Sequence, residues 1–131
     1  MMLLTGLSIK AIVIIIRWLT VDVEPHPSPE AVDSYRHALD FDPTYAWAWN
    51  GCGLAHAALN QWSDALDCYQ QAVKYNTGDV WFWHNCGEAW MALENYERAI
   101  EDFQTALSLD RTHEPTRRKL QQAKDLLQTE E

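Results

Sequence analysis

The sequence predicts an all-α fold, built as a solenoid of antiparallel helix hairpins. Three observations predict this class. Residues 46–79 and 80–113 align without gaps as two copies of one unit. The apolar residues inside each copy recur at helical spacing, and only short turn-forming stretches separate the apolar runs. A period of about 20 to 50 residues is typical of a stacked array, in which each unit buries its apolar face against its neighbours.

Residues 1–29 precede the array and differ from it. Residues 2–19 are strongly apolar, but Lys10 and Arg17 interrupt them, and the features of a secretory signal are missing. A membrane span needs about 20 mostly apolar residues. We therefore expect this segment to pack on the protein or to derive from a misassigned start, with a membrane anchor as the alternative. A proline-rich, extended linker then marks the domain boundary: Pro25, Pro27 and Pro29.

The repeats occupy residues 30–113, as a partial unit 30–45 and the full units 46–79 and 80–113. In each full unit the first helix carries an apolar stripe, and the second helix carries an aromatic residue between two alanines. Small residues should let two helices approach closely around that ring. The residues expected to pack the repeats are Trp49, Cys52, Gly53, Ala65, Tyr69 and Ala72 in one unit, and Trp83, Cys86, Gly87, Ala99, Phe103 and Ala106 in the other.

This pattern resembles that of the tetratricopeptide repeat family, W-x-x-L-G-x-x-Y…A-x-x-x-F-x-x-A…P. The partial unit matches it at Ala31, Tyr35, Ala38 and Pro43. The departures are apolar or aromatic exchanges at core positions and a softened turn, so the expected fold is unchanged. Cys52 and Cys86 replace the leucine, His56 and Trp90 replace the tyrosine, and Thr77 and Arg111 replace the closing proline.

Residues 114–131 are expected to form a polar capping helix and a tail. Repeat arrays need such a terminal helix for solubility. Pro115 stands in its first turn, where a missing N–H is harmless. About two and a half repeats is short for a stable array. Either residues 8–19 complete the missing helix, or the protein forms a homo-oligomer.

The composition argues against several functional classes. The chain has 131 residues and a net charge of −9. This charge disfavours nucleic acid as a partner, because binding to phosphates depends on Lys and Arg. Basic or mixed-charge proteins fit an acidic body better. Three cysteines without CxxC spacing predict neither a disulfide scaffold nor a zinc module, and they indicate a reducing, cytoplasmic location.

No catalytic constellation emerges, and we expect no enzymatic activity, no cofactor and no metal. His84 and Cys86 lie two positions apart on a helix and face different sides, so they cannot act as base and nucleophile. Cys52 and His56 have a spacing that can hold a metal, and Cys86 would lie nearby if equivalent positions stack. A metal-binding enzyme at these three residues is the remote alternative, since Cys at a core position behaves as a small hydrophobe.

The resemblance implies a concave groove lined by the first helices of the hairpins. A tryptophan recurs on the groove side of both units, although the packing pattern does not require one there. Tryptophan is enriched where protein partners dock. Two other interpretations stay open: the rings pack against the next helix, or the N-terminal segment covers them. The predicted groove residues are Trp47, Asn50, Leu54, Trp81, His84, Glu88, Met91 and Arg118.

Some family members bind the acidic C-termini of chaperones through a clamp of Lys, Asn and Arg side chains. The corresponding positions here are Asn50, Leu54, Asn85, Pro115 and Lys119, and only Asn85 and Lys119 are compatible. We therefore expect no such clamp.

The function predicted from these observations is a non-enzymatic scaffold that binds a peptide or protein segment in a helical groove. The alternative is a membrane-tethered assembly factor or structural subunit that uses residues 2–19. The identity of the partner does not follow from the sequence.

Overall fold

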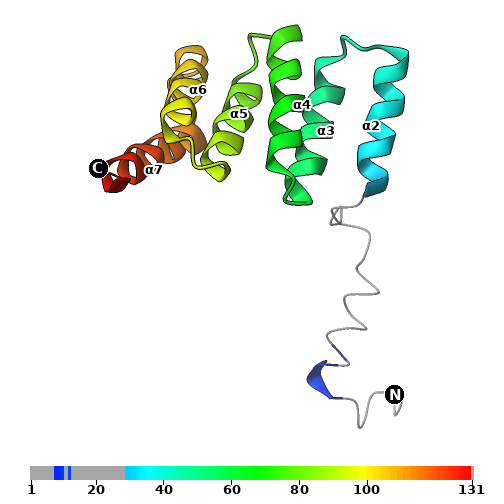
Figure 1. The fold of residues 1–131 in the computed structure, drawn as a ribbon, viewed down its shortest axis with the longest axis horizontal. Coiled ribbons are helices and arrows are strands. Elements are labelled where there is room, and N and C mark those ends of the chain that lie inside the picture. Colours follow the sequence, from blue (N-terminus) through cyan, green and yellow to red (C-terminus); the bar gives the residue numbers. More distant parts are fainter. Residues whose placement is uncertain (1–7, 11, 13–28, 131) are drawn as a thin grey trace.

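The computed structural model describes residues 8–10, 12 and 29–130. In this part of the chain the long elements are all helices, and they lie in a row in chain order (Figure 1). Each helix contacts the next one along the chain, and α5 also contacts α7. This arrangement confirms the predicted all-α solenoid of hairpins. The helices are α2 (Pro29–Phe41), α3 (Ala46–Ala58), α4 (Trp62–Tyr75), α5 (Val80–Ala92), α6 (Tyr96–Leu109) and α7 (Glu114–Glu130).

Most of the N-terminal segment lies outside the described residues. The expectations for residues 2–19 as an anchor or packed segment, and for residues 8–19 as a first helix, therefore stay predictions. Pro29 is described and opens α2, a position where its missing N–H leaves no helical hydrogen bond unmade. None of the helices in the described ranges combines the length and the apolarity that a bilayer crossing requires.

The first helix of each full hairpin ends in the same backbone motif. Asn60 and Glu94 both adopt left-handed backbone conformations, with φ of 62° and 60°. The N–H of Gln61 donates to the carbonyl of His56, and the N–H of Asn95 donates to that of Trp90, both over 2.9 Å. This is the Schellman arrangement, which satisfies the last carbonyls of a helix and reverses the chain. The short connections expected from the sequence therefore form tight antiparallel hairpins.

Close packing inside each hairpin depends on a glycine facing an aromatic ring. A methyl group built on Gly53 would collide with the ring of Tyr69, and one on Gly87 would collide with the ring of Phe103. Gly51 has the same relation to Tyr35 on α2. The absence of a side chain lets the ring lie directly on the backbone of the neighbouring helix.

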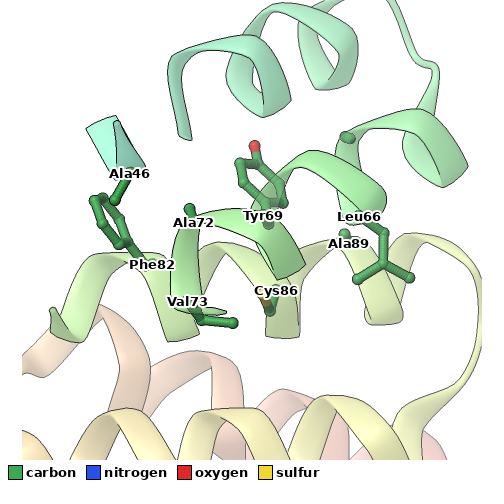
Figure 2. Close-up of a cluster of buried hydrophobic side chains, with 9 residues drawn as sticks. Ala46, Leu66, Tyr69, Ala72, Val73, Phe82, Cys86 and Ala89 are labelled. Carbon is green, nitrogen blue, oxygen red and sulfur yellow. The ribbon is translucent and has the colours of Figure 1, made fainter. Parts of the chain in front are cut away.

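The main core cluster lies between α4 and α5, with Ala46 from the start of α3 (Figure 2). Phe82 and Phe103 are fully buried, and the alanines beside the rings are buried as well. Cys86 lies in this cluster with Phe82 and Val73. The predicted packing residues are therefore buried or, for the two tryptophans Trp49 and Trp83, partly buried against the core.

Trp49 and Trp83 also tie each first helix to the turn that precedes it. The indole Nε1–H of Trp49 donates to the carbonyl of Pro43 over 2.8 Å. In the next unit, Trp83 donates to the carbonyl of Thr77 over 2.9 Å. The replacement of the usual proline by Thr77 leaves this bond intact, because every residue type supplies the backbone carbonyl.

Candidate peptide-binding face

Trp47 and Trp81 lie in the first turns of α3 and α5 and are about half exposed, at 52% and 47%. Each ring also braces the next unit. Trp47 meets the ring of Phe82 edge-on at 4.8 Å between centroids, and Trp81 meets the ring of His113 at 4.4 Å. Packing and exposure therefore coexist: one part of each indole contacts the next unit while the rest stays open to solvent.

The face continues down the same side of each helix. Leu54 follows Trp47 by seven residues, or two turns, and is 49% exposed. Glu88 follows Trp81 by the same interval. We use the term first-helix face for the surface formed by Trp47, Leu54, Trp81 and Glu88 together with Lys119 of α7.

Two of the predicted groove residues, Asn50 and His84, are buried and so are not part of the exposed surface of the groove. Asn50 accepts a hydrogen bond from Nδ2 of Asn85 over 2.8 Å, so these amides join α3 to α5. His84 Nδ1 lies 2.8 Å from Oγ1 of Thr116, which joins α5 to α7. Both Asn50 and His84 hold neighbouring first helices together because their positions face the next unit, and both side chains are largely buried.

An ion pair dominates the charge of the face. Lys119 Nζ lies 3.1 Å from Oε1 of Glu88, and His84 Nε2 lies 3.7 Å from the same oxygen. The polar contact with His84, reinforced by Lys119, lowers the pKa of Glu88 to about 2. Glu88 is therefore an anion at neutral pH, and it already engages the cation of Lys119.

A shallow pocket of about 290 Å³ adjoins this pair between α5 and α7. Met91, one of the predicted groove residues, contributes to its wall. Arg118 is exposed and pairs with Glu114 on its own helix over 3.1 Å, so it lies outside the pocket lining. The residues that line the pocket are Trp62, Glu88, Met91, Ala92, Lys119, Gln122 and Leu126.

Sequence reasoning missed a polar network behind the face. Thr116 Oγ1 lies 2.6 Å from Nδ1 of His113 as well as close to His84. One proton assignment lets Thr116 donate to Nδ1 of His84 and accept from Nδ1 of His113, with the proton of His84 on Nε2, which faces Glu88. Nε2 of His113 is then the one buried polar side-chain atom in the described ranges without a partner. No spacing signal could have revealed contacts that join α5 to the start of α7.

The cysteines are arranged differently from the prediction. Cys86 is buried in the main core cluster (Figure 2) and does not belong to the group of possible ligands that contains Cys52 and His56. Cys68 of α4 takes that place instead. One ligand atom each from Cys52, His56 and Cys68 lie within 4.8 Å of one another, and all three residues are buried. The remote alternative of a metal site at Cys52, His56 and Cys86 is therefore corrected in its third member, since Cys68 and not Cys86 groups with Cys52 and His56.

The Cys52 thiol is unusually acidic for a buried cysteine. The hydrogen bond from Cys68, together with the nearby guanidinium of Arg36, lowers the pKa of Cys52. The same contact, with burial, raises the pKa of Cys68. The two cysteines therefore share one hydrogen bond.

Comparisons with known proteins agree with this helical-repeat architecture. Sequence models described as "Tetratricopeptide repeat" match residues 46–79 and 80–113, and one described as "TPR repeat" matches residues 29–60. The chain belongs to the tetratricopeptide repeat family. No curated protein matches the sequence.

Solved tetratricopeptide repeat domains have the same fold. The first such domain of Spaghetti (RPAP3), bound to the HSP90 peptide SRMEEVD, is 24% identical, with a TM-score of 0.73 over 75% of this chain and 78% of that one. The first domain of human RPAP3 is 24% identical, with a TM-score of 0.74 over 76% and 79%. The second domain of human RPAP3, in complex with the HSP70 peptide SGPTIEEVD, is 19% identical, with a TM-score of 0.69 over 71% and 78%.

Proposed function

We propose that this tetratricopeptide repeat protein is a non-catalytic adaptor that binds an extended segment of a partner protein across the first-helix face. The observation that carries this proposal is the half exposure of Trp47 and Trp81 at matched positions of consecutive units. Covering a large exposed ring with a partner lowers the free energy. Half-exposed aromatic side chains that are held rigidly are therefore typical binding anchors.

Charge selects the kind of partner. The similar domains of RPAP3 have HSP90 and HSP70 peptides bound, and both peptides end in Glu-Glu-Val-Asp. Here the anion of Glu88 occupies the face and neutralises Lys119. The carboxylate of Glu88 would repel a carboxylate-rich peptide and so weaken its binding. The net charge of −9 on the chain adds to this repulsion. A segment with apolar side chains and flanking Lys or Arg therefore complements this face better.

The experiment is a selection from a displayed peptide library, followed by calorimetric titration of the selected peptide and of SRMEEVD as an acidic comparison. The W47A and W81A variants should each weaken the selected peptide by roughly tenfold or more, since an interface anchor contributes about 2 kcal/mol. Phe41 is 96% exposed at the end of α2 and is not one of the residues that define the first-helix face. The F41A variant is therefore the matched control and should bind as the wild type does.

Thermal denaturation of each variant separates lost contacts from lost packing, because Trp47 and Trp81 also contact Phe82 and His113. Equal binding by the wild type and by a folded W47A/W81A double variant would refute the proposal. Tighter binding of SRMEEVD than of any basic peptide would refute the charge argument and leave the face itself in place.

A further inference from the structure

A second site lies on the other side of the first hairpin, away from the first-helix face. We propose that Cys52, His56 and Cys68 are three protein ligands for a thiophilic metal ion of the Zn²⁺ class. This inference is independent of the proposed peptide binding, because it involves different side chains and a different surface.

The geometry of the trio suits a tetrahedral ion. The three ligand atoms lie within 4.8 Å of one another. Zinc bonds of about 2.3 Å to sulfur and 2.0 Å to nitrogen place tetrahedral ligand atoms about 3.5–3.8 Å apart. Movement of the ligand atoms by about 1 Å or less, through rotation of the three side chains, would close the difference. Cys52 and His56 lie one turn apart on α3, and Cys68 faces them from α4, so the rigid hairpin holds them.

The histidine is already oriented for ligation. Its Nδ1 lies 2.7 Å from Oε1 of Gln61, and an amide oxygen can only accept, so Nδ1 carries the proton. Nε2 is then the nitrogen whose lone pair is available to a metal. The backbone N–H of Gln61 donates to the carbonyl of His56 within the Schellman motif, which holds Gln61 in place. Ligating histidines commonly have a partner of this kind on the second nitrogen.

The trio also has an entry path and an open side. Cys52, His56 and Cys68 line part of a cleft of about 670 Å³, whose walls are α2 and α4 and whose floor is α3. Carboxylates outnumber permanent cations along it: Asp33, Asp40, Asp64 and Asp67 against Arg36. Negative walls raise the local concentration of cations. Three protein ligands leave a fourth position, which a water molecule or a cleft carboxylate would fill.

The test uses the full chain, reduced and freed of metal by a chelator. Titration with Co²⁺ should produce thiolate-to-cobalt charge-transfer absorption and the intense visible bands of a tetrahedral site, with saturation at one equivalent. Zn²⁺ should displace these bands and raise the melting temperature, because an ion that binds only the folded state stabilises it.

Variants of the proposed ligands identify which side chains bind the metal ion. Replacement of Cys52 or Cys68 by serine should weaken Co²⁺ binding, reduce the charge-transfer absorption per bound ion to about half or less, and remove most of the Zn²⁺-dependent rise in melting temperature. The matched control is C86S, which removes the third buried cysteine outside the trio and should keep both signals. The Q61A variant keeps every ligand and lies at an exposed position, and it should bind Co²⁺ about 10- to 100-fold more weakly.

Three outcomes would overturn the proposal. The first is a folded wild-type protein that gives no tetrahedral cobalt spectrum. The second is a C68S variant that binds Co²⁺ with the affinity and the charge-transfer intensity of the wild type. The third is an unchanged Co²⁺ affinity in Q61A, which also decides the matter if the cysteine variants fail to fold. Formation of a Cys52–Cys68 disulfide in air, with no Co²⁺ binding after reduction, would assign the trio to thiol redox chemistry instead.

Discussion

At the scale of single residues, the left-handed residue after the first helix of each hairpin shows how a backbone conformation favours some residue types over others. Asn60 and Glu94 occupy equivalent left-handed positions. Asparagine tolerates this region, whereas the Cβ of glutamate is crowded there. Asn60 also accepts a hydrogen bond from Nε1 of Trp62 over 2.8 Å. The second hairpin therefore carries a local strain that the first does not.

Replacing Glu94 should relieve that strain. We expect E94N or E94G to raise the free energy of unfolding by about 0.5–1 kcal/mol, because either residue adopts positive φ more readily. Urea denaturation followed by circular dichroism measures this change. The N60A variant is the reverse control and should destabilise the protein. A loss of stability in both E94N and E94G would contradict the strain argument.

At the scale of elements, the glycine–ring contacts set the distance between paired helices. Glycine inside a helix ordinarily costs about 1 kcal/mol relative to alanine. At Gly87 this preference should reverse, because a methyl group would collide with Phe103. The hairpin α5–α6 therefore depends on an intrinsically poor helix former.

The G87A variant should lower the free energy of unfolding by about 2 kcal/mol through overpacking. Gly78 lies in a turn, where an added methyl group would meet only Oδ1 of Asn76 at an ordinary contact distance of 3.7 Å, so G78A is the matched control and should change stability little. The cost of G87A should fall in an F103L background, and a double-mutant cycle measures that coupling. A cost that is the same in both backgrounds would show that the collision with Phe103 is not the cause.

At the scale of the whole molecule, the array is held together by polar contacts between first helices as well as by its core. Asn50 and Asn85 join α3 to α5, and the contact of His84 with Thr116 joins α5 to α7. The Glu88–Lys119 pair adds a second link between α5 and α7. An ion pair therefore contributes to the packing of the capping helix α7 on α5.

The Glu88–Lys119 pair makes the free energy of unfolding depend on pH in the acidic range. Since the pKa of Glu88 falls from 4.5 to about 2 on folding, its contribution is complete above pH 4.5 and disappears as the pH falls towards 2. Because the pair is partly exposed, we expect about 1 kcal/mol or less. E88Q should be less stable than the wild type at pH 7, and the difference should shrink towards pH 2. Urea denaturation at several pH values measures it, and a difference that does not vary with pH would rule out this origin.

The sequence by itself determined the helices, the repeat, the turns and the packing residues. These follow from periodicity and from the placing of Gly53, Gly87 and the rings that face them, which are local properties of the chain. The recurrence of Trp47 and Trp81 is likewise a property of the sequence alone, and it stands out because the packing pattern does not require a tryptophan at either position.

Only the tertiary structure decided which side chains meet across helices. It buried Asn50 and His84, engaged Lys119 with Glu88, and placed Cys68 rather than Cys86 beside Cys52. The repeat register predicts which residues are equivalent in successive units, and equivalent residues need not touch. Contacts between α3 and α4, or between α5 and α7, depend instead on the angle and distance at which the helices pack, and these emerge only when all side chains are packed together.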